Sequence, residues 1–236
     1  MANEKKTILS FENVSKTFDY KTHSLLNINL QVEQGEFVFL CGRTGSGKST
    51  FLRLITCELR PTSGKIIFDD KDITAMPNWE IPYHRRKIGM IRQGAGLFLE
   101  DRTVAENLEF VMRATGHEEE VLHERAMKAL GMVGLKQKAD ALPSEMAIGE
   151  RKRVEIARAL LNNPKIIIAD EPTASLDGDM AWDIMSLFDD INRLGVTMLI
   201  VTHDKQIVNI LRRRVVTFAR GKILGDVKNG RYGDLV

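Results

Sequence analysis

The chain has 236 residues, 43% of them hydrophobic, and a formal net charge of +2. This length allows one large α/β domain, alone or with a smaller lobe, and the near-neutral charge gives no electrostatic reason to expect a nucleic-acid partner. The chain starts with polar residues, so no signal peptide is expected, and it has no apolar run of about eighteen residues, so no membrane span is expected. We therefore expect a cytoplasmic protein.

The first part of the chain predicts β-strands. Alternating apolar residues indicate one strand over 8–14 and a second over 28–32. Between them, Phe18 stands in an otherwise polar segment. Partial burial in the core is the favoured interpretation of Phe18, and a platform that stacks on an adenine ring is the alternative.

A glycine-rich segment follows the apolar run 37–40 and precedes a helical pattern that starts at Ser49. It fits G-x-x-x-x-G-K-[ST], in which backbone N–H groups surround phosphates, a lysine reaches the outer phosphates and a hydroxyl binds Mg²⁺. A strand, a glycine loop and a helix N-terminus together form an anion site. The candidate nucleotide-binding residues are Gly42, Arg43, Thr44, Gly45, Ser46, Gly47, Lys48, Ser49 and Thr50.

The middle of the chain predicts two strands and then helices. The strands cover 65–68 and 87–91, and the second ends at Arg92-Gln93. Helical spacing follows over 103–112 and 118–133, and a capping pattern at Pro143-Ser144-Glu145 is expected to open a helix that continues to Leu161. We therefore expect a single domain, 1–236, that contains a helical insert at roughly 94–160.

The last part of the chain repeats a strand-and-helix order. An apolar strand over 165–170 ends in Asp170-Glu171, and a helix over 178–194 leads to a strand over 196–201 that ends in Thr202-His203-Asp204. Ligands of open α/β sheets bind beyond the carboxyl ends of such strands. A short helix over 205–211 and two strands, 215–219 and 222–224, finish the chain.

The side chains at these strand ends suit the hydrolysis of a Mg²⁺-bound nucleotide. Lys48 can neutralise phosphate charge, while Ser49 and Asp170 can hold the metal. Glu171 is expected on the other face of the strand end, where it could act as general base toward a water molecule. Gln93 could bridge metal and water, or be an ordinary loop amide. His203 could donate to the γ-phosphate, or cap a helix.

In order and spacing, these motifs resemble the nucleotide-binding subunit of ATP-binding cassette (ABC) ATPases over nearly the whole chain. Residues 42–49 match the Walker A motif, and Gln93 matches the Q-loop. Residues 166–170 match the Walker B motif, and Glu171 matches the catalytic glutamate that follows it. Residues 175–177 match the D-loop, His203 matches the switch histidine, and Phe18 matches the adenine-stacking aromatic. The resemblance implies a P-loop NTPase of α/β class with a mainly parallel central sheet, an antiparallel N-terminal β part and a helical subdomain. It also implies Mg²⁺-dependent hydrolysis of ATP.

Within the family, the chain resembles the cell-division ATPases over 60–66, 85–91 and 101–107. That resemblance implies a homodimer that closes on ATP binding and lies on the inner face of the cell membrane beneath an integral membrane subunit. Its motion would regulate peptidoglycan hydrolysis. ATPases of lipoprotein-release and macrolide-export transporters share these stretches, so a transporter ATPase stays open as an alternative. An ATP-gated scaffold with little turnover is a third.

One motif departs from the family pattern. The signature L-S-G-G-[QE] corresponds here to Met146-Ala147-Ile148-Gly149-Glu150. In the family this loop reaches the γ-phosphate held by the partner subunit, so the resemblance implies that Gly149 contacts nucleotide in trans. Ala147 lacks the serine hydroxyl, and Ile148 adds a branched side chain where the backbone should approach. We therefore expect intact ATP binding with slow hydrolysis, unless a second ATPase chain supplies a better signature.

Overall fold

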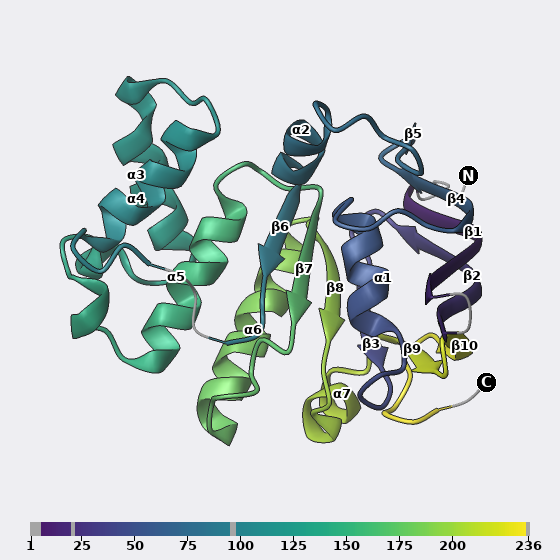
Figure 1. The fold of residues 1–236 in the computed structure, drawn as a ribbon. Helices are drawn as coiled ribbons and strands as arrows, with labels where there is room; N and C mark the ends of the chain where they lie inside the picture. Colours follow the sequence, from purple (N-terminus) through teal and green to yellow (C-terminus); the bar gives the residue numbers. More distant parts are fainter. Residues whose placement is uncertain (1–5, 20–21, 95–97, 235–236) are drawn as a thin grey trace, which may run out of the picture.

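The computed structural model describes residues 6–19, 22–94 and 98–234. Within them lies a six-stranded sheet in the order β10-β9-β3-β8-β7-β6 (Figure 1). Strands β9, β3, β8, β7 and β6 run parallel, and only β10 pairs antiparallel to its neighbour. These strands are β3 (Phe37–Cys41), β6 (Ile88–Ile91), β7 (Ile166–Asp170), β8 (Thr197–Val201), β9 (Arg214–Ala219) and β10 (Lys222–Val227).

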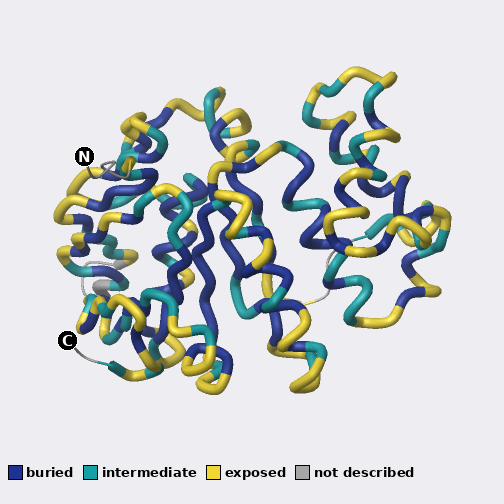
Figure 2. Tube along the Cα trace, turned by 180° about the vertical axis from the view of Figure 1, so that it is seen from behind, coloured by how far each residue is buried: buried dark blue, intermediate teal, exposed yellow. Residues whose placement is uncertain are grey.

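The central strands are apolar on both faces because both faces are covered. All five residues of β3 and of β8 are buried, as Figure 2 shows for the middle of the molecule. Successive side chains alternate between two cores. Phe37, Phe39 and Cys41 face the core on the α5 and α6 side, while Val38 and Leu40 face the core that contains α1 and the N-terminal strands. This double cover explains the near-continuous apolar runs in the sequence.

A second, antiparallel sheet has the order β2-β1-β4-β5. It contains β1 (Thr7–Asp19), β2 (Thr22–Glu33), β4 (Ser63–Phe68) and β5 (Lys71–Asp72). The first two strands extend beyond the predicted ranges, because backbone pairing continues through polar residues where no apolar pattern marks it. Phe18 therefore lies on β1 and is 49% exposed, so the favoured interpretation of partial core burial was wrong.

Seven α-helices lie within the described ranges. They are α1 (Lys48–Ile55), α2 (Ile81–Arg86), α3 (Val104–Ala114), α4 (Leu122–Met132), α5 (Ile148–Leu160), α6 (Gly178–Arg193) and α7 (Lys205–Leu211). Helices α3, α4 and α5 pack on one another on the side of the molecule away from the antiparallel sheet (Figure 1). The limits of a helical insert at 94–160 stay a prediction. Over residues 6–19, 22–94 and 98–234, no helix is both long and apolar enough to cross a bilayer.

The helix predicted from residue 143 onward is interrupted. Pro143–Glu145 forms a single 3₁₀ turn, and α5 begins only at Ile148. Ala147 between them has an extended backbone, with φ −64° and ψ 156°. The Glu150 carboxylate accepts a hydrogen bond from the Ala147 N–H at 3.0 Å, which satisfies one of the N–H groups at the new helix start. The altered signature segment is thus the N-terminus of α5.

Three aromatic rings join the two sheets through α1. Phe51 of α1 stacks on Phe11 of β1 with ring centroids 4.3 Å apart, and lies 5.3 Å from Phe218 of β9. All three side chains are fully buried. We expect Phe51→Leu to lower the free energy of unfolding by about 1–2 kcal/mol, because both aromatic contacts and some packing volume are lost. Urea unfolding measures this, and the same change at the half-exposed Phe110 should alter stability by less than about 0.5 kcal/mol.

Candidate functional site

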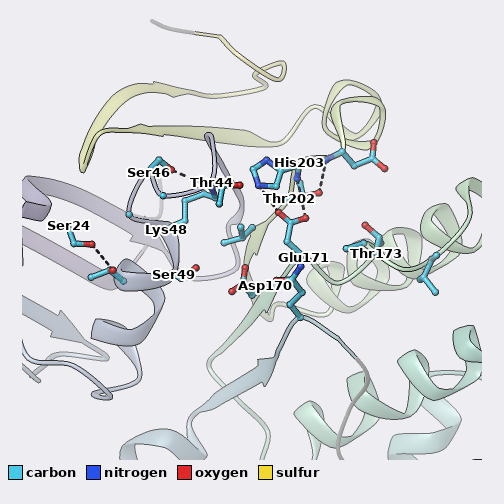
Figure 3. A pocket seen from close by; sticks show the side chains of 18 residues that line it. Ser24, Thr44, Ser46, Lys48, Ser49, Asp170, Glu171, Thr173, Thr202 and His203 are labelled. Atoms are coloured by element: carbon cyan, nitrogen blue, oxygen red, sulfur yellow. Dashed lines mark hydrogen bonds and ion pairs between the residues drawn. The ribbon is translucent and has the colours of Figure 1, made fainter. Parts of the chain in front are cut away.

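A cavity of about 660 Å³ opens at the carboxyl ends of β3, β7 and β8. It brings together most of the residues predicted for nucleotide binding and catalysis (Figure 3). The predicted residues that line it are Thr44, Gly45, Ser46, Gly47, Lys48, Ser49, Thr50, Gln93, Asp170, Glu171 and His203. Segments from four separate parts of the chain therefore meet at one sheet edge, as the rule for parallel sheets predicts.

The phosphate loop needs glycine partly because neighbouring backbone lies close to it. Gly42 has φ +140°, and a Cβ there would stand 2.2 Å from the Phe218 carbonyl oxygen. At Gly47, with φ +110°, a Cβ would stand 2.7 Å from the Ser24 carbonyl oxygen. Both positions exclude other residues by strain and by contact. The loop is also tied to the C-terminal hairpin, since the Gly221 N–H donates to the Ser46 carbonyl at 3.0 Å.

Lys48 points back into the loop. Its Nζ donates to the carbonyl oxygens of Gly42 at 2.7 Å and Arg43 at 3.1 Å, and lies 3.4 Å from Ser46 Oγ. Burial lowers the pKa of Lys48, while the carboxylates of Glu171 and Asp170 act in the opposite direction. The ammonium group is therefore held next to the cavity with the loop folded around it.

The two carboxylates at the carboxyl end of β7 line the same cavity. Asp170 is the last residue of β7, and at Glu171 the backbone turns into the left-handed region with φ +50°. This turn breaks the strand alternation, so the expectation that Glu171 lies on the opposite face was wrong. Burial is the main reason that the pKa values of both Asp170 and Glu171 are raised above their ordinary values.

Glu171 is close to His203 at the end of β8. The backbone N–H of His203 donates to Glu171 Oε2 at 3.3 Å, and Nε2 of the His203 ring lies 3.2 Å from Glu171 Oε1. Oε1 itself is buried and accepts no hydrogen bond from any described residue. The ring Nδ1 of His203 lies 3.5 Å from the Tyr232 hydroxyl. Among the described residues, this carboxylate oxygen thus stands at ion-pair distance from an imidazole but accepts no hydrogen bond.

Four predicted residues do not line the cavity. Gly42 and Arg43 take part through the carbonyl groups that bind Lys48. Phe18 is exposed on β1, with Lys16 Nζ 5.5 Å from its ring centroid. Gly149 lies in the first turn of α5. Its predicted contact would be with a nucleotide of another subunit, so one chain alone does not test it.

The structure adds lining residues that were not among the predicted site residues, although Leu176 belongs to the predicted D-loop. The further lining residues are Ser24, Thr173, Ala174, Leu176, Val201, Thr202 and Asp204. Ser24 Oγ lies 2.7 Å from Thr50 Oγ1, which links β2 to α1 beside the phosphate loop. Ser24 belongs to no recognised sequence motif, so only the pairing of β1 with β2 could have indicated that it lies at the cavity. Thr202 and Asp204 flank His203, and their position after a buried strand was a usable signal.

The raised pKa of Asp170 predicts a pH-dependent stability. A carboxyl group that is harder to ionise in the folded chain favours folding below its ordinary pKa, and this contribution is lost as pH rises through the folded-state pKa. We therefore expect Asp170→Asn to raise the melting temperature of the nucleotide-free protein at pH 7.5. The gain should shrink as the pH falls toward 5, as calorimetry would measure. A gain that grows on acidification would contradict the raised pKa.

Comparisons with known proteins agree with this geometry. Residues 25–174 match the model of the ABC transporter family. The Bacillus subtilis cell division ATP-binding protein FtsE is 39% identical over 226 residues, which cover 96% of this chain and 99% of that protein. FtsE of Escherichia coli K12 is 40% identical over 220 residues, or 93% of this chain and 99% of that protein.

Solved structures share the fold. The ATP-binding cassette MJ0796, a dimer in a post-hydrolysis state bound to ADP and Pi, aligns with a TM-score of 0.81 at 33% identity, over 95% of this chain and all of that chain. CbiO1 of Clostridium perfringens, part of the ABC transporter complex cbiONQ, aligns with a TM-score of 0.88 at 31% identity, over 95% and 90% of the two chains. The chain therefore belongs to the ABC transporter family, as an ATP-binding cassette ATPase.

Proposed function

We propose that this protein hydrolyses Mg²⁺-bound ATP with Glu171 as the general base. The observation that carries the proposal is the buried Oε1 of Glu171, which lines the cavity and accepts no hydrogen bond from any described residue. A water molecule there would supply the missing donor, and its proton would pass to this oxygen. His203, within 3.2 Å of Oε1, lies where it could turn to the γ-phosphate.

The phosphate loop would position the triphosphate. Its backbone N–H groups and the N-terminus of α1 attract negative charge. Lys48 already lies at the cavity wall, and phosphate oxygens would replace the loop carbonyls as partners of its ammonium group. We further propose that Phe18, exposed on β1, stacks on the adenine ring.

The donor set around Asp170 fits Mg²⁺. Ser49, Gln93 and Asp170 supply oxygen ligands to one cavity, and Mg²⁺ prefers a few such ligands together with phosphate oxygens and water. A cation beside Asp170 would also offset the burial that raises the pKa of its carboxyl group. When bound, the ion would neutralise charge on the phosphates.

We propose a cell-division role in which ATP closes a homodimer beneath an FtsX-like integral membrane subunit. Identities of 39% and 40% with FtsE over nearly whole chains support this proposal. In the closed dimer, Gly149 of one subunit would approach the nucleotide of the other. The protein would thus lie on the inner face of the cell membrane, and its motion would regulate peptidoglycan hydrolysis beyond it.

Purification from membranes tests the partner. A tagged protein with Glu171→Gln, extracted in mild detergent with Mg²⁺-ATP, should retain one integral membrane protein that is identified by mass spectrometry. Lys48→Ala, which lacks the phosphate-binding ammonium, should give weaker dimer formation under the same conditions. Recovery of a permease that translocates a substrate would favour the transporter alternative and contradict the division role.

A second candidate function is an ATP-gated scaffold with little turnover. The altered signature favours it, because Ala147 has no hydroxyl and the exposed Ile148 occupies the first position of α5. The two functions differ in a growth assay of cells that depend on this protein. If Lys48→Ala abolishes function and Glu171→Gln does not, ATP binding without hydrolysis is the working activity.

A further inference from the structure

Helix α5 carries a buried pair of opposite charges, Lys152 and Glu155, which we call the α5 charge pair. Their residues are 7% and 3% exposed. Lys152 Nζ donates to Glu155 Oε2 at 2.8 Å and to the carbonyl oxygen of Gly94 at 3.0 Å. Gly94 directly follows Gln93, which lines the nucleotide cavity. One ammonium group therefore connects α5 to the backbone next to a proposed catalytic residue.

Helix α5 makes a second contact, with Phe98. Arg158 lies six residues further along α5 than Lys152, and its guanidinium is 5.5 Å from the ring centroid of Phe98. Glu155 stands between the two cations in the sequence, three residues from each. Burial lowers the pKa of Arg158, and the charge of Glu155 acts in the opposite direction. Helix α5 thus contacts Gly94 and, separately, Phe98, and Glu155 lies three residues from the cation of each contact.

The position of the α5 charge pair relates it to the active site. A cavity of about 410 Å³ has Gly94, Lys152 and Glu155 in its wall, together with Glu171 and Ile148. Glu171 also lines the nucleotide cavity. The link between α5 and the loop therefore lies next to the proposed general base. It also adjoins the altered signature segment at the start of the same helix.

Stability alone does not account for a buried ion pair. Removing two charges from water is unfavourable, and apolar side chains of similar volume commonly serve a helix core as well or better. In some proteins, buried polar groups are retained because they fix one arrangement among several. Here the arrangement that is fixed is the position of Gly94 relative to α5.

We propose that Lys152 is a positioning residue that holds the Gln93 loop to α5. Because Lys152 joins the two segments, a movement of Gln93 toward the nucleotide would be accompanied by a change in the orientation of the signature segment. The proposal rests on the proposed role of Gln93. It makes Glu155 the group that keeps the Lys152 ammonium in place, and it gives Lys152 no contact with the nucleotide itself.

Lys152→Met tests the proposal, because it removes the donor and keeps most of the apolar stem. We expect kcat to fall about tenfold with the Kd for ATP changed less than about twofold, as for other residues that act through a neighbour. Hydrogen exchange at residues 92–94 should become faster, since their tether to α5 is lost. Unchanged kcat, or unchanged exchange at these residues, would overturn the proposal.

Arg153→Met is the matched control. Arg153 also lies on α5 and donates to a backbone carbonyl, that of Val133 at 3.1 Å, which is outside the Gln93 loop. It should alter stability without changing kcat by more than about twofold or affecting exchange at residues 92–94. An equal loss of kcat in Arg153→Met would mean that any contact of α5 matters, and would contradict a specific role of Lys152.

The double variant Lys152→Met with Glu155→Gln separates positioning from stability. It removes both charges of the α5 charge pair, so the buried carboxylate no longer faces a missing ammonium group. The melting temperature should therefore return toward that of the unmodified protein. Turnover should stay low, because the bond to Gly94 is still missing. If the melting temperature and the turnover both recovered, the α5 charge pair would have a purely structural role and the proposal would be overturned. An unmodified protein without ATP turnover would contradict the proposed function, whereas hydrogen exchange would still test the tether itself.

Discussion

Replacing Glu171 with Gln is expected to lower ATP turnover by about 10²–10⁴-fold while ATP binding is kept. The amide has nearly the same shape but cannot take the proton of a water molecule. Binding should be unchanged or tighter, because the substitution removes a negative charge from the cavity that would hold the triphosphate. Single-turnover phosphate release and equilibrium titration with ATP measure the two effects separately.

Glu80→Gln is a suitable control for this experiment. Glu80 pairs with Lys71 outside the nucleotide cavity, so turnover should stay within about twofold of the unmodified protein.

The pH profile of the unmodified protein gives a further check. Since burial raises the pKa of Glu171, activity should fall on the acid side at a pH above the ordinary range of glutamate. Turnover by Glu171→Gln at the unmodified rate would contradict the assignment.

Restoring the signature should have the opposite effect. Ala147→Ser together with Ile148→Gly is expected to raise kcat by about 10²-fold, since one hydrogen-bond donor to a transition-state oxygen is typically worth that much. The serine hydroxyl would supply the donor, and the glycine would let the backbone approach the γ-phosphate of the partner subunit. An unchanged rate would show that the altered signature does not limit hydrolysis.

The fold should tolerate this double change. Ile148 is 62% exposed, so its removal leaves no cavity in the core. Ala147 is the N-cap of α5 and provides no side-chain acceptor. A serine at an N-cap typically stabilises a protein by about 1 kcal/mol. This gain would offset the stability of about 0.5–1 kcal/mol that a glycine within the helix typically loses. Ile148→Leu keeps a bulky side chain and should leave kcat unchanged. Assays at several protein concentrations would show whether the gain depends on dimer formation.

The sequence could predict the meeting of Lys48, Gln93, Asp170 and His203, because that rests on strong rules. Apolar runs bounded by turns mark buried parallel strands, and the ends of such strands share one edge. The glycine loop is a local motif whose conformation is encoded in nine consecutive residues. Most strand and helix ranges follow from the same periodicities.

Other features depend on contacts that no local pattern contains. The turn at Glu171 has φ +50°, where its backbone N–H bonds to Val201 on the next strand at 3.0 Å. The break before α5 was hidden because Pro143-Ser144-Glu145 reads as an ordinary helix start. Lys152 is charged, yet it is buried and donates to the carbonyl of Gly94, which is 58 residues away in the sequence.

The phosphate loop also depends on the end of the chain. The Gly221 N–H binds the Ser46 carbonyl, and Gly42 lies against the carbonyl of Phe218, so β9 and β10 enclose a loop that is made early in synthesis. Because chains emerge from the ribosome starting with the N-terminus, the motif is translated long before its supports exist. Chains that terminate before residue 214 lack both of these contacts, so we expect them to bind nucleotide more weakly than the whole protein.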